Sequence, residues 1–488
     1  MAGRHARTTR GRFVRPVVAV LALLCLAAPA LMPASSAAFT ALTTGPASSF
    51  TARATFGLTQ TAPCFSDIGG GCTTVPGIAK GVSVVVSPDG KHVYTGSATN
   101  SVVAEFSRNA TTGALTRLAS PNACVTSTAG LAGCTTIGST IMDEVWDLAI
   151  SPDGKHVYVA AYSSSTVVSF SRNSTTGALT LLRCLYDGSV SAPAGCASTS
   201  ARGIKGANGI VVSPDGAYVY VTGYGSNALA VFTRNATTGA LTQASGISGC
   251  FANGNNNSIG CTTDVRGMLK PYYLRVSPDG ASVYVAGYSS NAIAIFQRDM
   301  ATGVLAQPAS PNKCFYNTTS TVVTECTAAR GLSNVYHVGI APDGATVYAL
   351  GNTSNAVAAF TRNASTGVLT PVAAPNACVN SGTVLTGCSA ARAISGPTGI
   401  DFSPDGLFAF VSAQGSNAVA VFRHNNNTGV LTQLTGTSGC VGGLAGDGCT
   451  AGLGLSSAGA VATSPDGRDV YVAGGSTDGY VTVLNLTH

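Results

Sequence analysis

Charge is scarce in this chain, because Asp, Glu, Lys and Arg together make up 9% of its 488 residues. Glycine occupies 59 positions, whereas tryptophan occurs once. Low charge with abundant glycine is typical of a β-rich, turn-rich exported protein and argues against a disordered chain or one built from long helices. No ten-residue stretch of the repeats described below has a helical period of 3.6, which excludes a helical solenoid.

The chain also lacks apolar runs long enough to cross a membrane. Its longest such run, Val17 to Ala28, follows an arginine-rich head. It is shorter than the roughly 20 residues that a spanning helix needs, and the small residues Ser36 and Ala38 follow it as a cleavage site. We predict a signal peptide over 1–38, a linker over 39–49, and a secreted or extracytoplasmic protein, in the periplasm or at the cell surface. After cleavage we expect no stable membrane insertion; an uncleaved anchor is the alternative.

The net charge of +6 is a property of this leader. Five arginines and no acidic residue lie within it, so the mature chain carries about +1. Nucleic-acid binding needs a clustered basic surface, which this chain does not supply. We therefore expect no nucleic-acid partner.

Fourteen cysteines remain after the leader and form seven pairs, each 8 to 12 positions apart. The pairs are Cys64 with Cys72, Cys124 with Cys134, Cys184 with Cys196, Cys250 with Cys261, Cys314 with Cys326, Cys378 with Cys388, and Cys440 with Cys449. In an exported protein they predict seven local disulfides. Zinc is the alternative, but its ligands are usually closer in sequence and include histidine, which is absent beside these pairs.

A Ser-Pro-Asp-Gly turn recurs seven times, opening at Ser87, Ser151, Ser213, Ser277, Ala341 (Ala for Ser), Ser403 and Ser464. The intervals are 64, 62, 64, 64, 62 and 61 residues, and such a period indicates a repeat architecture. In the third repeat, turn signals separate four short runs, 209–213, 218–222, 228–234 and 240–243. Four short antiparallel strands make one propeller blade. We predict an all-β, seven-bladed propeller over 50–488 with one local disulfide loop per blade.

The two ends of the chain predict how the ring closes. The last repeat stops after its third strand, at His488, and residues 57–60 (GLTQ) match 114–117 (ALTR) of the first repeat. Phe50–Thr61 should therefore supply the fourth strand of blade 7, which removes an open sheet edge. Aromatic residues 7 and 19 positions after the turn-opening residue are predicted to pack between blades: Tyr94, Tyr158, Tyr220, Tyr284, Tyr348, Phe410, Tyr471, and Phe106, Phe170, Phe232, Phe296, Phe360, Phe422.

The repeat unit VSPDG-x-x-VYV, followed by N-x-x-x-x-F-x-R-N-x-x-T-G-x-L, resembles the YVTN-type and lactonase-like seven-bladed β-propellers over 50–488. The resemblance implies the fold, and the family includes enzymes and binding proteins alike. Its members typically place a histidine five residues before the turn-opening residue. This chain has Val82, Trp146, Asn208, Tyr272, Tyr336, Thr398 and Gly459 there. His337 is one position out of register, which on a regular strand turns a side chain to the opposite face.

The cystine loops are predicted to crowd around one mouth of the central channel, where a rigid, loop-rich rim would hold a site. Four arginines stand eleven positions before the turn-opening residue: Arg202, Arg266, Arg330 and Arg392. Together they would bind a carboxylate, phosphate or sulfated sugar. The alternative is that each arginine fixes its own cystine loop through backbone carbonyls.

Tyrosines occupy the same sector. Tyr162, Tyr224 and Tyr288 lie at equivalent turns of blades 2 to 4, and Tyr272 and Tyr336 precede inner strands of blades 4 and 5. Aromatic faces beside cations suit a sugar or an aromatic acid. Packing against glycine-rich loops is the alternative.

Candidates for proton transfer are few. His337 and Glu144, at the starts of the inner strands of blades 5 and 2, are the predicted catalytic pair if there is catalysis. His92 and His156 follow Pro-Asp-Gly turns on the other face and are predicted to be solvated. The turn aspartates are explained by turn chemistry. No Ser-His-Asp arrangement, phosphate loop or metal-ligand cluster is present, so we expect no cofactor and no metal.

These patterns favour an exported binding or interaction module. Its partner would be a small anionic or carbohydrate ligand, or a protein, bound on the cystine-loop face over blades 2 to 5. The alternative is a lactonase-like hydrolase or cyclase acting on a carboxylate-bearing lactone, and the second alternative is a structural protein of the cell envelope.

Overall fold

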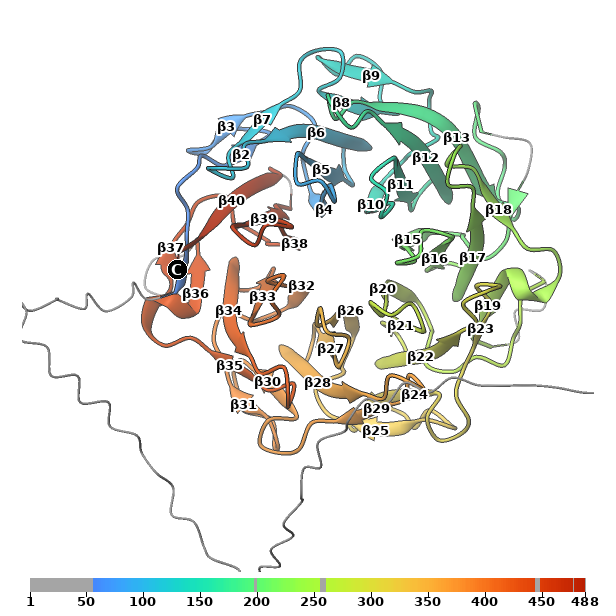
Figure 1. Cartoon of the computed structure of the whole chain (residues 1–488), viewed down its shortest axis with the longest axis vertical. Coiled ribbons are helices and arrows are strands. Elements are labelled where there is room, and N and C mark those ends of the chain that lie inside the picture. The colour runs from blue at the N-terminus through green and yellow to red at the C-terminus, as the bar shows by residue number, and fades with distance from the viewer. Residues whose placement is uncertain (1–55, 197–199, 255–259, 444–447, 477, 488) are drawn as a thin grey trace, which may run out of the picture. The chain divides into compact units, whose positions relative to one another are not determined.

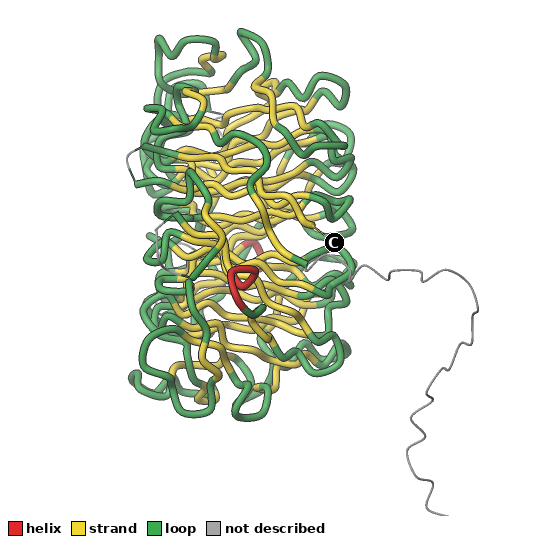
Figure 2. The backbone as a smooth tube through the Cα atoms, turned by 90° about the vertical axis from the view of Figure 1, so that its left-hand side faces the viewer, coloured by secondary structure: helices red, strands yellow, loops and turns green. Residues whose placement is uncertain are grey.

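The computed structural model describes residues 56–196, 200–254, 260–443, 448–476 and 478–487. The predicted signal peptide and linker, and the first residues of the predicted closing strand, lie outside these ranges. Seven sheets surround a central axis as the blades of a propeller (Figure 1), and their strands run between two loop-covered faces (Figure 2). The fold class is therefore confirmed.

Each blade begins with an inner strand at the channel and proceeds outward. The inner strands are β4 (Gly81–Val86), β10 (Val145–Ile150), β15 (Ala207–Val212), β20 (Pro271–Val276), β26 (Val335–Ile340), β32 (Pro397–Phe402) and β38 (Ala460–Thr463). The second strands are β5 (His92–Ser97), β11 (His156–Ala161), β16 (Tyr218–Gly223), β21 (Ser282–Gly287), β27 (Thr346–Gly351), β33 (Phe408–Ala413) and β39 (Asp469–Gly474). The third strands are β6 (Val102–Arg108), β12 (Thr166–Arg172), β17 (Ala228–Arg234), β22 (Ala292–Arg298), β28 (Ala356–Arg362), β34 (Ala418–His424) and β40 (Tyr480–Thr487).

The fourth strand is split in most blades, which the sequence did not predict. Its two halves pair with opposite ends of the third strand: β7 (Leu115–Arg117) and β8 (Cys124–Thr126), β18 (Leu241–Gln243) and β19 (Cys250–Ala252), β23 (Leu305–Ala306) and β24 (Cys314–Asn317), β29 (Leu369–Pro371) and β30 (Cys378–Asn380), β35 (Leu431–Gln433) and β36 (Cys440–Gly442). Blade 2 keeps one continuous strand, β13 (Leu179–Asp187). Short 3-10 turns, η1 (Ile247–Gly249) and η3 (Gly436–Gly439), precede β19 and β36.

A fifth, short strand lies parallel to the outer half of the fourth in six blades: β3 (Thr73–Thr74), β9 (Cys134–Thr136), β14 (Ser200–Ala201), β25 (Thr327–Ala329), β31 (Ser389–Ala390) and β37 (Thr450–Ala451). In blade 3 two isolated bridges take its place, Phe251 with Thr262 and Asn253 with Asp264.

The seven predicted disulfides are present, and each joins a cysteine to its near neighbour in the same blade. The bonds join Cys64 to Cys72, Cys124 to Cys134, Cys184 to Cys196, Cys250 to Cys261, Cys314 to Cys326, Cys378 to Cys388, and Cys440 to Cys449. The pairing predicted from the sequence is therefore confirmed, and the zinc alternative is not.

The place of these disulfides differs from the one expected. In blade 1, for example, Cys124 is on β8 and Cys134 on β9, the two strands farthest from the channel. The expectation that the cystine loops crowd around the channel mouth was wrong. After its third strand, the chain runs along the outer edge of the blade before it returns to the next inner strand. The cystine links the two ends of this outer loop.

The N-terminal segment closes the ring as predicted. β1 (Gly57–Thr59) and β2 (Phe65–Ser66) both pair antiparallel with β40, and Figure 1 shows the blue N-terminal strands beside red β40. The predicted aromatic residues are buried between blades; Tyr94 and Phe106, for example, have no exposed surface. The described part of the chain contains no helix with the length and apolar character that a membrane span requires.

Candidate functional site

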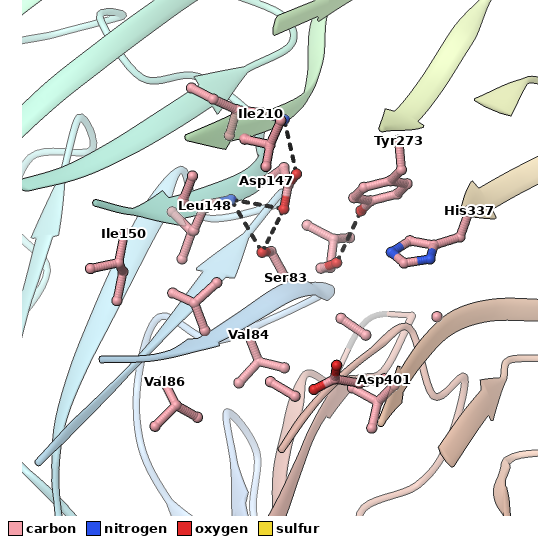
Figure 3. A pocket seen from close by; sticks show the side chains of 18 of the residues that line it. Ser83, Val84, Val86, Asp147, Leu148, Ile150, Ile210, Tyr273, His337 and Asp401 are labelled. Carbon is pink, nitrogen blue, oxygen red and sulfur yellow. Dashed lines mark hydrogen bonds between the residues drawn. The ribbon is translucent and has the colours of Figure 1, made fainter. Parts of the chain in front are cut away.

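The central channel contains a cavity of about 330 Å³ between the inner strands. Asp147, Tyr273, His337 and Asp401 reach it from β10, β20, β26 and β32, so four blades contribute (Figure 3). Arg275, also on β20, lines the same cavity. Among the cavity-lining residues it is the one permanent cation, facing two carboxyl groups.

These side chains reach the channel because of where they stand in the repeat. Asp147, Tyr273 and His337 lie four residues before the turn-opening residue, and Arg275 and Asp401 lie two before it. Alternate residues of a strand share a face, so both positions point the same way. A bulge at the start of the strand, between Val335 and His337 on β26, shifts the register there.

His337 is buried beside the guanidinium of Arg275, with Arg275 Nη2 3.0 Å from His337 Nε2. Burial, and secondly this cation, lower the pKa of the imidazole well below its usual value, so the ring is neutral at neutral pH. Arginine can only donate, so Nε2 accepts and Nδ1 carries the hydrogen. Among the described residues this buried Nδ1 has no hydrogen-bond partner.

The two carboxyl groups differ in how they are held. Asp147 accepts hydrogen bonds from the Ser83 hydroxyl at 3.0 Å, from its neighbour Leu148 N–H at 2.9 Å and from Ile210 N–H at 3.0 Å, so it ties blades 1 to 3 together. Burial raises its pKa to about 6, although these donors and Arg275 oppose the shift.

Asp401 is half-buried on the cavity wall, and its Oδ2 accepts the Thr463 N–H at 2.6 Å. Burial raises the pKa of this carboxyl as well, against the opposing effects of its backbone donors and Arg275. The cavity thus combines a neutral imidazole with a free N–H, a guanidinium and two carboxyl groups that are less acidic than usual. Such a set can hold a small polar molecule and move a proton near neutral pH.

Tyr273 crosses the channel above this cavity. Its hydroxyl lies 3.2 Å from the carbonyl oxygen of Val82 and 3.3 Å from that of Trp146, so it links blade 4 to blades 1 and 2. Its ring lies 5.0 Å from that of His337 and 5.7 Å from that of Tyr336. Tyr273 therefore separates the polar cavity from the aromatic residues at the starts of the inner strands.

The five tyrosines predicted to bind a ligand are brought together at that end of the channel. Tyr272 is the centre of the group, with ring centroids 4.6 Å from Tyr336, 4.8 Å from Tyr288 and 5.4 Å from Tyr224. Tyr162 lies 5.7 Å from Tyr224. Their role in ligand binding stays a prediction.

The four predicted arginines lie with the outer cystine loops and not at the channel. Arg202 donates to the carbonyl oxygens of Ala244 and Gly260, at 2.8 and 2.9 Å. Arg392 donates to that of Gly436.

The other two arginines make different contacts. Arg266 forms ion pairs with Asp264 and Glu325, and the side chain of Arg330 lies against Gly387. The carbonyl contacts of Arg202 and Arg392 match the alternative in which an arginine fixes its own cystine loop, and ligand binding by the four arginines remains a prediction.

The predicted catalytic pair is not assembled. His337 lines the cavity, whereas Glu144 lies outside it and accepts a hydrogen bond from the Ser163 hydroxyl in a neighbouring turn. Asp147, Arg275 and Asp401 were missed. The sequence could have indicated these three residues, because ionisable side chains are exceptional at the two channel-facing positions of an otherwise apolar inner strand.

The family model described as lactonase, 7-bladed beta-propeller matches residues 188–319 and 385–485. This chain is a lactonase-like seven-bladed β-propeller. A proposed 6-phosphogluconolactonase from Bacteroides uniformis superimposes with a TM-score of 0.50 at 20% identity, covering 72% of this chain and 82% of that one. The periplasmic gluconolactonase PpgL of Pseudomonas aeruginosa gives 0.47 at 17% identity, covering 72% and 84%. No curated protein sequence matches the chain significantly. At these identities the solved structures establish the fold alone.

Proposed function

We propose that this propeller is an exported lactonase-like hydrolase that opens a small, uncharged lactone in its central channel. The observation that carries the proposal is the cavity in which Arg275, His337 and Asp401 face one another. The family match supports the reaction class, and seven disulfides support an oxidising, extracytoplasmic location.

Hydrolysis adds water across the ring ester. The carboxylate of Asp401 takes a proton from water, the water oxygen attacks the lactone carbonyl, and negative charge develops on the carbonyl oxygen. His337 Nδ1–H and Arg275 are the donors available for that oxygen. The ring C–O bond then breaks, and the proton passes from Asp401 to the departing alkoxide. Asp147 is less suited to act as the base because its oxygens already accept three hydrogen bonds.

The charges of the cavity favour an uncharged substrate. Two carboxyl groups face one guanidinium, so an anionic substrate would meet net repulsion once both are ionised. The arginines that were expected to hold a substrate carboxylate contact the outer loops instead, as Arg202, Arg266 and Arg392 show. A carboxylate-bearing lactone is therefore the less suitable substrate.

Hydrolysis of glucono-1,5-lactone above the buffer rate, with its 6-phosphate in parallel, tests the proposal. We expect turnover of the uncharged lactone, and Asp401→Asn and His337→Gln should each lower kcat about 100-fold. Glu325→Gln, in the outer loop of blade 4 and away from the channel, is the matched control and should retain full activity. Activity that survives both channel substitutions would overturn the mechanism.

A binding module is the second candidate function. The aromatic group at the channel end favours it, because its tyrosines lie in the sector of blades 2 to 5 that the sequence indicated. In that case the ligand meets the aromatic rings and not the cystine loops.

A further inference from the structure

Six aromatic side chains form one continuous surface at the end of the channel that Tyr273 closes. This aromatic mouth consists of Trp146, Tyr162, Tyr224, Tyr272, Tyr288 and Tyr336, all of them half-buried. Trp146 joins the tyrosines through Tyr162 and Tyr272, with ring centroids 5.8 and 5.9 Å apart. The rings come from the starts of three inner strands and from the turns between second and third strands, so four blades contribute.

The hydroxyl groups of this surface are unused, which distinguishes it from the protein interior. The six fully buried tyrosines between blades each donate to a glycine carbonyl of a neighbouring blade, as Tyr94 does to Gly177 and Tyr158 to Gly239. Among the described residues, none of the five mouth tyrosines has a hydrogen bond to its hydroxyl. The buried Nε1 of Trp146 also has no partner there. Packing alone would not favour five tyrosines over phenylalanines at these positions.

Two lysines flank the mouth at equivalent repeat positions, seven residues before the turn-opening residue. Lys80 Nζ lies 5.3 Å from the Trp146 ring centroid, and Lys270 Nζ lies 4.7 Å from that of Tyr224. Both residues have φ near 50°, which holds them in tight turns above the rings. The surface therefore offers flat apolar faces, free hydroxyl groups and a positive edge.

We propose that the aromatic mouth binds an oligosaccharide lying across blades 2 to 5. Pyranose rings present apolar C–H faces that stack on aromatic rings, while their hydroxyl edges pair with polar groups such as tyrosine hydroxyls. Six adjoining rings provide more stacking surface than one sugar covers, and Tyr273 spans the channel beneath them through its hydrogen bonds to blades 1 and 2, so a chain lies along the surface. This inference names the ligand chemistry of the second candidate function, on which it rests, and is independent of lactone hydrolysis.

Trp146 is the only tryptophan of the protein, so its fluorescence reports on this site directly. Cellohexaose, chitohexaose and hexagalacturonate are the probes, each titrated while the emission of Trp146 is followed and the heat of binding is measured. We expect at least one hexasaccharide to shift the emission with saturation. Tyr272→Ala should weaken its binding at least tenfold, and Tyr272→Phe, which keeps the stacking face, should weaken it about threefold.

Tyr316→Ala is the matched control, because Tyr316 is half-buried on the outer strand β24, away from the mouth. It should bind as the unchanged protein does. If hexagalacturonate binds most tightly, Lys270→Gln should reduce both its affinity and its salt dependence, which supports a role of the positive edge.

No response to any hexasaccharide at millimolar concentration would overturn the proposal, as would binding that survives Tyr272→Ala and Tyr224→Ala. Capture of a protein at this surface without sugar binding would also overturn it, while leaving the second candidate function in place. Lactone hydrolysis is measured on the same variants. We expect it to be unchanged, so failure of the channel mechanism and failure of oligosaccharide binding are separate results.

Discussion

Glu105 is an acidic residue enclosed in the packing between blades 1 and 2. It has no exposed surface, its Oε2 accepts the Leu179 N–H at 3.1 Å, and its Oε1 has no partner among the described residues. Burial raises the pKa of this carboxyl to about 8, so it is mostly protonated at neutral pH. Burying the neutral, protonated acid lowers the stability of the fold far less than burying its carboxylate would.

Glu105→Gln should therefore change how stability depends on pH. Between the ordinary pKa of 4.5 and about 8, the folded protein retains a proton that the unfolded chain has released, so the native protein loses stability as pH rises through this window. Glutamine is neutral throughout and avoids the loss. In urea unfolding, we expect the variant's advantage to grow with pH by up to roughly 1.4 kcal/mol per unit.

Glu325→Gln supplies the comparison, because it removes an acidic residue that is only half-buried, in the outer loop of blade 4. Parallel profiles for Glu105→Gln and the native protein would show that Glu105 is ionised in the fold.

Residue identities at the channel could be predicted only in part. His337 was predicted as a catalytic candidate although it stands one position out of register with the histidine of the family that the chain resembles. The bulge at the start of β26 places the preceding Tyr336 in the aromatic mouth and His337 in the cavity. Asp401 was missed because its partners, Arg275 and His337, come from other repeats. A repeat pattern describes what blades share, whereas the site depends on how they differ.

At the scale of elements, arginines at the ends of third strands join neighbouring blades. Each reaches back to the Pro-Asp-Gly turn of the preceding blade: Arg108 to Asp466, Arg172 to Asp89, Arg234 to Asp153, Arg298 to Asp215 and Arg362 to Asp279. The turn aspartates therefore do more than shape their turns. Burial opposes their ionisation, but hydrogen bonds from the turn serines, from these arginines and from backbone N–H groups outweigh it and lower the pKa of Asp89 and Asp153 to about 2.

The same contacts correct the expectation for two histidines. His92 and His156 are buried, with Nδ1 within 2.7 Å of Arg172 and Arg234, and are not solvated. Burial and the nearby arginine lower the pKa of His92 to about 4. In blade 6, His424 replaces the arginine and contacts Thr346 and Gly406 instead.

Arg234→Gln should destabilise the protein by about 3 kcal/mol, because it leaves Asp153 and the Tyr158 hydroxyl without their buried partner. This loss in the free energy of unfolding is at the lower end of the range for buried ion pairs, because about a third of the Asp153 side chain is exposed to solvent. Denaturant unfolding measures it. His424→Gln removes hydrogen bonds but no ion pair and should cost about 1 kcal/mol; equal losses would show that the ion pair adds nothing.

The closing strand β1 was predicted from four residues that resemble an internal strand, since local similarity is retained even when the strand completes a distant blade. Leu58, on β1, is 1% exposed and packs in the cluster that contains Phe408 and Phe410. Leu58→Ala should therefore cost about 2–4 kcal/mol, measured by thermal melting or denaturant unfolding. Thr59→Ala, half-buried on the same strand, should cost less than about 1 kcal/mol. Similar losses at both positions would mean that β1 does not pack as described.

At the scale of the whole molecule, every disulfide is local and yet one bears on closure of the ring. In blades 1 to 6 the cystine joins outer strands that follow the third strand of the same blade. In blade 7, the bond between Cys64 and Cys72 holds β2 and β3, which reach β40 from the opposite end of the chain. Fraying of this segment would open the ring, whereas fraying of another cystine loop exposes only the rim of one blade.

Replacing Cys64 and Cys72 with alanine should therefore lower the Tm more than the same change at Cys124 and Cys134. The closed loops span 8 and 10 residues, and chain entropy assigns about 3 kcal/mol to each, slightly more to the longer one. Loop entropy alone thus predicts nearly equal effects, while ring closure predicts a clearly larger effect in blade 7. Hydrogen exchange identifies the cause, because only the blade 7 variant should lose protection in β40 and in the neighbouring inner strands β38 and β4. If both double variants had equal melting temperatures and faster hydrogen exchange only in the altered loops, the ring would remain closed without the disulfide between Cys64 and Cys72.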